Sequence, residues 1–289
     1  MHHYFAFGCH ITSNYRISEL HETLPASPDI TIHAQPAREP VDINHLEANP
    51  ERVTFSVKHT ARYHITQGNV IDIEYDTDAH PDNIDLFLLG TAMGVCLQQQ
   101  GRILLHACAI ATTPGEQATS ARLICAHSGT GKSTLAYWHY LRGFRVLTDD
   151  VACISQQDNH FIVHPGYPRV RVTKDSAKQL CINTQGKRTV TTCDLKYILP
   201  ITDHWKNTPL RISSIDVLEK DLQQTRLSAS EQLIALQEHS YRHHLLHPQQ
   251  RLQHHFMMTR QLLDTVKVVT ISRKVIDNTS IDHPTQEMV

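Results

Sequence analysis

The fold of this chain is decided by one stretch, Leu123-Ile124-Cys125-Ala126-His127-Ser128-Gly129-Thr130-Gly131-Lys132-Ser133-Thr134-Leu135. It has the pattern of a short apolar strand, a turn that contains glycine, and the opening of a helix. Backbone N–H groups of such a turn point inward, and the helix N-terminus adds positive potential, so the arrangement suits the phosphates of a nucleotide. The stretch therefore predicts an α/β fold with a phosphate-binding loop over residues 126–134.

Residue types in this loop have separate physical reasons. Gly129 and Gly131 permit backbone conformations and close approaches that a side chain would obstruct. We expect Lys132 to reach the β- and γ-phosphates and the Ser133 hydroxyl to ligate Mg²⁺. The predicted nucleotide-binding residues are Ser128, Gly129, Thr130, Gly131, Lys132, Ser133 and Thr134.

The loop departs from the usual pattern at its first position. The G-x-x-x-x-G-K-[S/T] motif begins with glycine, and this chain has Ala126 there. Alanine is the smallest replacement, and the remaining Ser-Gly-Thr-Gly-Lys-Ser-Thr keeps its strand–turn–helix context. The prediction of a phosphate loop therefore holds, with a loop that has lost phosphate binding as the alternative.

Two adjacent carboxylates, Asp149 and Asp150, follow Lys132 by 17–18 residues. One helix and one strand fit into this interval, which predicts that the pair lies at the carboxyl end of a parallel strand, where ligands gather in open α/β sheets. One carboxylate can hold Mg²⁺ while the other accepts the proton of an attacking hydroxyl. We assign Asp149 as the base and Asp150 as the metal ligand. The reverse assignment, and a pair of solvated turn aspartates, are the alternatives.

The loop, the turn Arg142-Gly143-Phe144 and the Asp-Asp strand end together resemble the HPr kinase/phosphorylase family. The resemblance is specific over residues 104–154. It implies an α/β, P-loop-containing core related to phosphoenolpyruvate carboxykinase, with ATP and Mg²⁺ as cofactors. In that family a histidine lies on the strand before the loop, a position that His106 occupies here. The resemblance thus implies catalytic roles for His106, Lys132 and Asp149, although a histidine in an apolar strand is otherwise most often a core residue.

Other segments resemble the HPr-kinase-like proteins of peptide natural-product clusters, including lasso-peptide clusters. These are the short N-terminal β region, Leu88–Ala92 and the turn Pro165-Gly166-Tyr167-Pro168-Arg169. The resemblance implies a precursor-peptide serine, at the C-terminus in some of these systems, as the phosphate acceptor. The downstream Gly-Arg-Asn-type signature tied to HPr docking is not found. HPr, a small hydroxyl compound, and a regulator that binds nucleotide without transferring phosphate are the alternatives. A homo-oligomer is also open, because HPr kinases are hexameric.

Four basic residues are predicted to bind the substrate. Arg169 and Arg171 alternate on one strand face after a proline turn, and guanidinium groups can bind phosphate or carboxylate bidentately. Lys187 and Arg188 lie in a turn that could form a mobile cationic lid near the γ-phosphate. The alternatives are a solvated strand face for the arginines and an ordinary charged turn for Lys187 and Arg188.

Composition excludes several classes of protein. The 289 residues are 40% hydrophobic and 19% charged, as in globular proteins, and the formal net charge of −2 provides no basic field for nucleic acid or an acidic membrane. No signal peptide and no long apolar run is found, so we expect no membrane partner and a cytoplasmic location. The seven cysteines contain no CxxC pair, which favours buried free thiols.

The predicted secondary structure changes from strands to a helix near residue 80. Earlier residues are rich in short strands, including a hairpin over 64–73 that turns at Gln67-Gly68-Asn69. Helical spacing begins at 84 and continues to about 99. We therefore predict a β-rich region over 1–80 and a kinase domain over 81–289.

The C-terminal third carries two further helical patterns, over 228–246 and 248–263. His243 and His247 would lie four apart on one face of the first helix, a spacing that can bind a metal. Packing of these helices on the sheet is the favoured interpretation.

Overall fold

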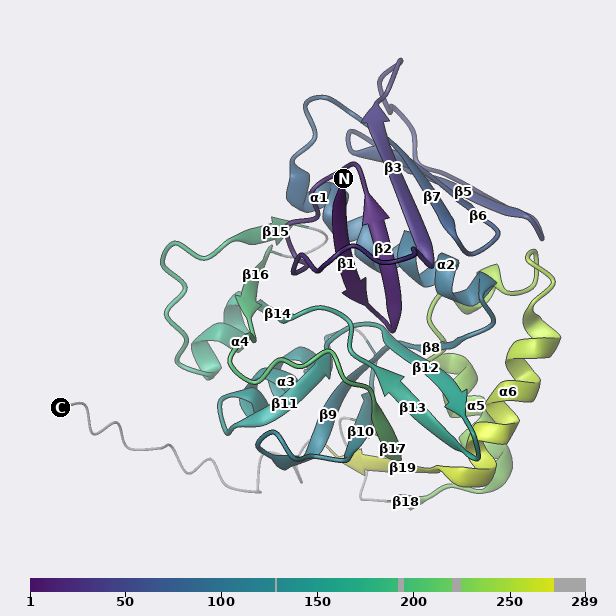
Figure 1. Cartoon of the computed structure of the whole chain (residues 1–289). Coiled ribbons are helices and arrows are strands. Elements are labelled where there is room, and N and C mark those ends of the chain that lie inside the picture. The colour runs from purple at the N-terminus through teal and green to yellow at the C-terminus, as the bar shows by residue number, and fades with distance from the viewer. Residues whose placement is uncertain (128, 192–194, 220–224, 273–289) are drawn as a thin grey trace.

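Three sheets organise the protein in the computed structural model, which describes residues 1–127, 129–191, 195–219 and 225–272. Figure 1 shows the sheet of the first seven strands above the larger sheet, with the third, small sheet beside them. Within the described residues, the chain is a mixed α/β protein with several sheets. Every described helix is too short or too polar to cross a bilayer.

The first sheet has the strand order β1-β2-β3-β7-β6-β5-β4. Residues of β2 and β6 alternate between buried and half-buried, the period of two that a sheet with one covered face requires. Gln67 and Gly68 both have positive φ, which confirms the predicted hairpin turn. The strands are β1 (His2–Ala6), β2 (Cys9–Ser13), β3 (Ile30–Pro36), β4 (His45–Ala48), β5 (Arg52–Val57), β6 (Ala61–Thr66) and β7 (Val70–Tyr75).

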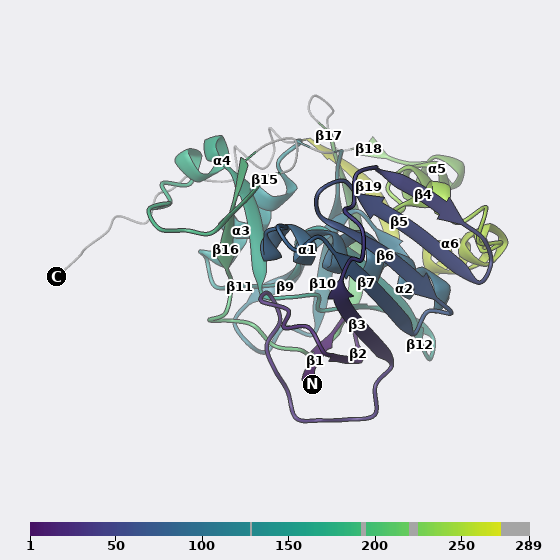
Figure 2. The ribbon, with the colours of Figure 1, turned by 90° about the horizontal axis from the view of Figure 1, so that it is seen from above.

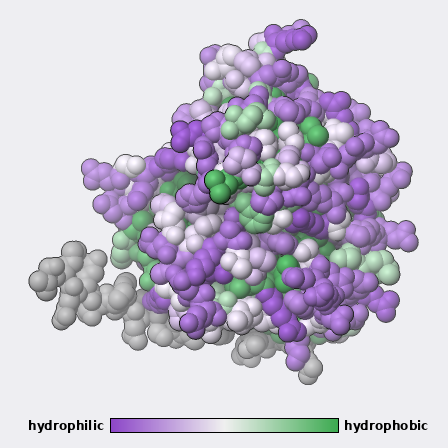
Figure 3. Space-filling view, in the orientation of Figure 1, coloured by the Kyte–Doolittle hydropathy of each residue, from purple (hydrophilic) through white to green (hydrophobic). Residues whose placement is uncertain are grey.

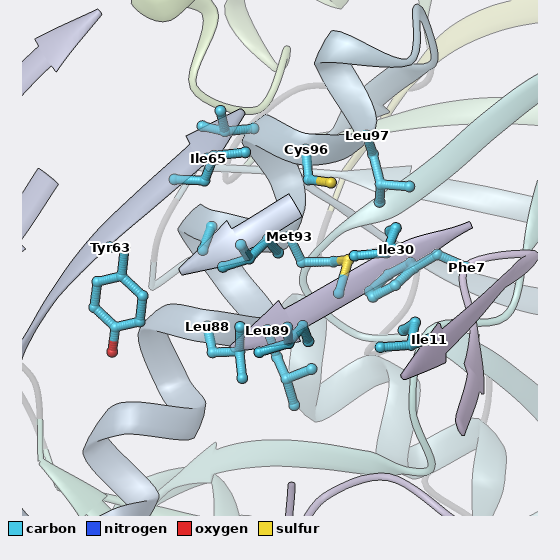
Figure 4. Packing of buried hydrophobic residues seen from close by; sticks show 14 of the residues in the cluster. Phe7, Ile11, Ile30, Tyr63, Ile65, Leu88, Leu89, Met93, Cys96 and Leu97 are labelled. Atoms are coloured by element: carbon cyan, nitrogen blue, oxygen red, sulfur yellow. The ribbon is translucent and has the colours of Figure 1, made fainter. Parts of the chain in front are cut away.

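A helical segment covers the inner face of this sheet, and its helical prediction is confirmed. It runs through α1 (Pro81–Phe87), a π-helical turn η1 (Leu88–Ala92) and α2 (Met93–Gln99). Residues on all sides of η1 and α2 are buried, because the segment lies between the first sheet and the rest of the chain. Figure 4 shows Leu88, Leu89 and Met93 beside side chains of the first sheet. The division of the chain at residue 80 stays a prediction.

The second sheet carries the predicted phosphate loop, in the strand order β11-β9-β10-β17-β13-β12-β8, with β19 paired to β17 and β18 paired to β19. Helix α3 packs on one face, and α5 and α6 pack on the other (Figure 2). Its elements are β8 (Ile103–Leu105), β9 (Ala107–Pro114), β10 (Ser120–Cys125), α3 (Lys132–Tyr140), β11 (Phe144–Thr148), β12 (Ala152–Gln157), β13 (His160–His164), β17 (Leu210–Glu219), β18 (Thr225–Arg226), α5 (Ala229–Glu238), α6 (Leu252–Thr265) and β19 (Lys267–Ser272).

The prediction that the aspartate pair follows a strand paired in parallel is wrong. Strand β11 pairs with β9, and that pairing is antiparallel. Strand β10 also pairs with β9 in the antiparallel sense. Both strands therefore run in the same direction on either side of β9, and their carboxyl ends meet at one edge of the sheet.

The third sheet and its helix lie against the α3 side of the molecule. Val170, Val172, Ala177 and Leu199 from these elements belong to the same apolar cluster as Leu135 and Ala136 of α3. The turn that contains Lys187 and Arg188 precedes β15. The elements are β14 (Arg169–Thr173), α4 (Lys174–Gln179), β15 (Thr189–Thr191) and β16 (Leu195–Pro200).

The predicted helix over 228–246 is interrupted. It ends at Glu238, and the next residues pair with the free edge of β8: the His106 N–H donates to the His239 carbonyl at 2.8 Å, and the Tyr241 N–H donates to the Leu104 carbonyl at 2.9 Å. These long-range hydrogen bonds outweigh a weak local helical preference. Only a 3₁₀ turn, η2 (His243–Leu245), follows.

His243 and His247 therefore do not share a face of a regular helix, and the metal-binding alternative for them is wrong. No group of three metal-ligating His, Cys, Asp or Glu residues occurs among the described residues.

The described cysteines are free thiols, of which Cys181 alone is exposed; Cys193 lies outside the described residues. The face of the molecule in Figure 3 is mainly hydrophilic, with small and separated hydrophobic patches. Most of the buried apolar residues therefore lie in the three internal clusters.

Close packing between α2 and Tyr241 leads to a stability prediction. A Cβ at Gly94 would lie 2.8 Å from Tyr241 Cε1, and the tyrosine is only 9% exposed. Overpacking of this kind outweighs the gain in helix propensity, so Gly94→Ala should lower the free energy of unfolding by about 1–2 kcal/mol in urea denaturation. Gly90→Ala, whose Cβ would meet only the Tyr241 hydroxyl at 3.3 Å, is the matched control. Equal stability of the two variants would contradict the packing argument.

Candidate phosphoryl-transfer site

Local backbone geometry explains the glycines of the loop. Strand β10 ends at Cys125 and α3 begins at Lys132. Gly131 caps the helix with φ 110°, and Gly129 has φ 80°, both in the left-handed region that glycine tolerates best. Among the described residues, no side-chain hydrogen bond caps the N-terminus of α3. The Thr130 N–H donates to the His127 carbonyl at 3.2 Å, so the donors that remain for an anion are those of the first turn of α3.

The remaining loop residues differ in their surroundings. Ala126 is fully buried in the apolar cluster that contains Ile124 and Leu135, so its methyl group faces the interior. Thr130 is also buried, and Thr134 donates a hydrogen bond to Ser176 Oγ at 2.7 Å, which directs its hydroxyl toward α4. Ser128 lies outside the described residues.

Lys132 lies folded across its own loop. Its side chain is buried, and Nζ donates to the Ala126 carbonyl at 2.6 Å. Burial lowers the pKa of Lys132, although the thiol of Cys108 and the carboxylates of Asp150 and Asp149 act in the opposite direction. The charge of the ammonium group therefore interacts with the charges of the two aspartates.

Asp149 is the more buried member of the pair, at 4% exposure. Its Oδ2 accepts a hydrogen bond from the Arg171 N–H at 3.0 Å, and its Oδ1 is buried without a hydrogen-bond partner. Burial raises the pKa of Asp149, and the charge of Asp150 raises it further. Hydrogen bonds from the Arg171 N–H and the Ser133 hydroxyl act to lower the pKa, but the net shift is upward. A carboxylate of raised basicity suits the role of proton acceptor.

Asp150 has the opposite electrostatic environment. Its side chain is 38% exposed, and Oδ1 lies 3.2 Å from His106 Nδ1. Burial acts to raise the pKa of Asp150, but the hydrogen bond and charge of His106, with Arg171 and Arg169, outweigh it and the pKa is lowered. Asp150 is therefore held ionised beside a more basic Asp149, and environments that separate two carboxylates in this way support different roles for them.

His106 reaches Asp150 because the predicted strand over 103–111 is broken at this residue. Strand β8 ends at Leu105 and β9 begins at Ala107. The main chain of His106 is held by the His239 carbonyl, and its ring also lies 3.2 Å from the Asp150 carbonyl. The side chain is thus placed toward the aspartates and not into the core.

Sequence reasoning missed a second histidine near the loop. The rings of His239 and His127 lie 5.1 Å apart, and His239 is only 4% exposed. Burial, together with the nearby His127, Lys132 and His106, lowers the pKa of His239 to about 4. Nothing local could have indicated His239, since it arrives through the pairing of residues 239–241 with the edge of β8.

Arg169 and Arg171 are buried, at 3% and 7% exposure, so the alternative of a solvated strand face is wrong. Both guanidinium groups bind Glu19, whose side chain is 1% exposed: Arg169 through Nε, and Arg171 through Nη2 at 3.2 Å. The Arg169 guanidinium also lies 4.3 Å above the ring of Tyr167. Glu19 comes from the N-terminal region, and no pattern around it in the sequence indicates this role.

Lys187 and Arg188 lie apart from the loop but near Arg169. Arg188 Nη2 binds Asp82 and donates to Ser18 Oγ at 2.9 Å. Lys187, Arg188 and Arg169 line one pocket of about 340 Å³. Of the four predicted substrate-binding residues, three thus meet in this pocket, and Arg171 lies beside Asp149. Their binding roles stay predictions.

The residues of the site fit a magnesium ion that is shared with phosphates. Mg²⁺ binds one or two carboxylates and takes its remaining ligands from phosphate and water. Asp150 is ionised and partly exposed, and Ser133 lies in the first turn of α3, where its hydroxyl acts on Asp149. The unpartnered Oδ1 of Asp149 is a further buried acceptor at the same place. Asp150 and Ser133 are the residues that would hold the ion.

The chain was compared with family models, with curated proteins and with solved structures. No protein-family model and no curated protein matches the chain. Among solved structures, the chain is similar to the Hpr(Ser) kinase/phosphatase from Coxiella burnetii, with 15% sequence identity and a TM-score of 0.28 over 54% of this chain and 97% of that chain. A TM-score of this size carries no argument about a shared activity, and the proposals below rest on the residues of the site.

The buried cluster around Glu19 leads to a second stability prediction. Glu19→Ala would leave two buried guanidinium groups without their carboxylate, which typically costs about 3–5 kcal/mol. We expect a loss of that order in chemical denaturation. Glu22→Ala is the matched control, because Glu22 is 56% exposed and its only described ion pair is to His2. If the Glu19→Ala protein were as stable as the control, the charges of Arg169 and Arg171 would have to be compensated by groups other than Glu19.

The raised pKa of Asp149 predicts how stability depends on pH. Because the folded protein binds this proton more tightly than the unfolded chain, the ionised carboxylate destabilises the fold as pH rises through the folded pKa. Asp149→Asn removes that charge and keeps an acceptor for the Arg171 N–H. Thermal unfolding should show a variant that is more stable than the parent at neutral pH, with the difference vanishing below the unfolded pKa near 3.8. A constant difference across this range would exclude Asp149 as its source.

Proposed function

We propose that this protein is a Mg·ATP-dependent kinase that transfers the γ-phosphate to a hydroxyl group of its acceptor. The observation that carries the proposal is the unequal pair of carboxylates next to the loop lysine. Asp149 is buried with a raised pKa, Asp150 is ionised against His106, and the charge of Lys132 interacts with both. One base, one metal ligand and one phosphate-binding cation are the side chains that phosphoryl transfer requires.

In the proposed reaction, the acceptor oxygen attacks the γ-phosphorus, and the bond from that phosphorus to the bridging oxygen of ADP breaks. Asp149 accepts the proton that the hydroxyl loses. Lys132 and the N–H groups of the loop stabilise the charge on the phosphoryl oxygens, in a preorganised arrangement. A bound Mg²⁺, held by Ser133 and Asp150, would neutralise further phosphate charge. His106 keeps Asp150 ionised and oriented.

The acceptor that we propose is a serine of a ribosomal precursor peptide. It rests on the resemblance of the sequence to the kinases of peptide natural-product clusters, and the C-terminal serine of such a peptide is the first candidate. HPr and a small hydroxyl compound are the other acceptors to test. The second candidate function is a regulator that binds nucleotide without transferring phosphate, which the buried Ala126 at the start of the loop favours.

Transfer of label from γ-labelled ATP tests the proposal directly. Acceptors are a serine-ended precursor peptide, HPr and small hydroxyl compounds. Loss of a positioned base typically costs about 10²–10⁴-fold, so Asp149→Asn should reduce transfer by that factor while nucleotide binding is kept. Lys132→Ala should weaken nucleotide binding as well, because it removes the cation that contacts the phosphates.

The possible outcomes separate the two functions. Label on the peptide alone would establish a peptide kinase. Transfer at the parental rate by Asp149→Asn would overturn the assignment of the base. Binding of ATP with no label on any acceptor would favour the regulator.

A further inference from the structure

A pocket of about 340 Å³ opens where the N-terminal region meets the third sheet. Its walls come from residues 18–21, from Pro168 and Arg169 at the start of β14, from the turn over 186–188, and from the end of β16. In Figure 1 the chain between β2 and β3 passes beside β15 and β16. The volume lies at the lower end of the range of small-molecule sites, about 300–1,000 Å³.

The side chains that line this pocket include more cations than carboxylates. Three cationic side chains line it, Arg169, Lys187 and Arg188, and Glu19 is the single carboxylate. The Glu19 carboxylate is already bound by Arg169 and Arg171, and Arg188 is paired with Asp82. Lys187 lies in an exposed turn and forms no ion pair with the described residues that surround it. The pocket therefore attracts an anion.

Arg169 adds a second and independent indication. The residue is 3% exposed, and its Nη1 and Nη2 are buried without hydrogen-bond partners. Buried donors without an acceptor are unfavourable. Because Arg169 lines the pocket, a planar oxyanion bound there could supply the missing acceptors after a small movement of the guanidinium group.

The pocket adjoins the candidate base through strand β14. Arg169 lines the pocket, and two residues further along the same strand the Arg171 N–H binds Asp149. Two residues of a strand span about 7 Å. A ligand that places a hydroxyl at Asp149 can thus place a second group in the pocket only if that group belongs to the same residue or to a neighbouring one.

From these contacts we infer that the pocket binds a carboxylate of the phosphate acceptor, close in the chain to the hydroxyl that is phosphorylated. Leu20, Ile198, Pro168 and Pro200 also line the pocket, and such walls suit a carboxylate on a carbon skeleton better than a free phosphate dianion. The α-carboxylate of a terminal residue and the side chain of a neighbouring Asp or Glu share this chemistry. The phosphorylation step rests on the proposed function, whereas binding of the carboxylate does not.

Three short peptides test the inference: N-acetyl-Ala-Ala-Ser with a free carboxylate, the same peptide as its C-terminal amide, and N-acetyl-Ala-Asp-Ser amide. Binding is measured by NMR titration of the intact protein, and transfer by label from γ-labelled ATP. A charged hydrogen-bonding group is worth about 1.5–3 kcal/mol, so the free acid should bind at least about 10-fold more tightly than the uncharged amide. Tight binding of the third peptide would identify a side-chain carboxylate as the natural partner.

Matched variants separate the pocket from the rest of the surface. Lys187→Gln removes one exposed cation of the pocket and should reduce the difference between acid and amide. Lys178→Gln removes an exposed cation on α4, outside the pocket, and should leave that difference unchanged.

Each outcome then has a defined meaning. Equal affinity for acid and amide, no binding of any of the three peptides, or an unchanged preference in Lys187→Gln would overturn the inference. A carboxylate preference that depends on Lys187, without transfer of label, would uphold the pocket and count against the proposed kinase activity on this acceptor.

Discussion

Strand β9 imposes the constraint on which the rest of the site depends. It pairs with β10 on one side and with β11 on the other, both in the antiparallel sense. The predicted phosphate loop follows β10 and the aspartate pair follows β11, so two segments that a helix separates in sequence meet at one sheet edge. The helix between them, α3, returns the chain to that edge and covers the face that Ile124 and Val146 share. Strand pairing thus brings Lys132 and the two carboxylates to the same edge of the sheet.

Buried charge is the second organising feature of the structure. Lys132, Asp149, Arg169, Arg171 and Glu19 are all at most 7% exposed. Buried charges are costly unless they are paired, and here each acts on a neighbour from another part of the chain. Glu19 links two distant parts of the chain, because it belongs to the N-terminal region and binds both arginines of β14. The N-terminal region therefore takes part in the site and does more than cover one side of it.

The same network explains why two adjacent carboxylates can act differently. Asp149 points into the interior, where burial makes ionisation costly, whereas Asp150 faces His106 and remains partly exposed. The two side chains are chemically the same, so the opposite shifts of their pKa values arise from their surroundings. The proposed roles of base and metal ligand would require this kind of separation.

The sequence by itself determined the loop, the aspartate pair and the hairpin at Gln67-Gly68, because each depends on neighbouring residues: glycines where φ is positive, apolar residues at a fixed period. Only the tertiary structure decided the direction of pairing of β11, the end of α5 at Glu238, and the positions of Glu19 and His239. Those features rest on hydrogen bonds and ion pairs between residues far apart in the chain. Local patterns carry no record of such contacts, since their free energy exists only once the sheets have assembled.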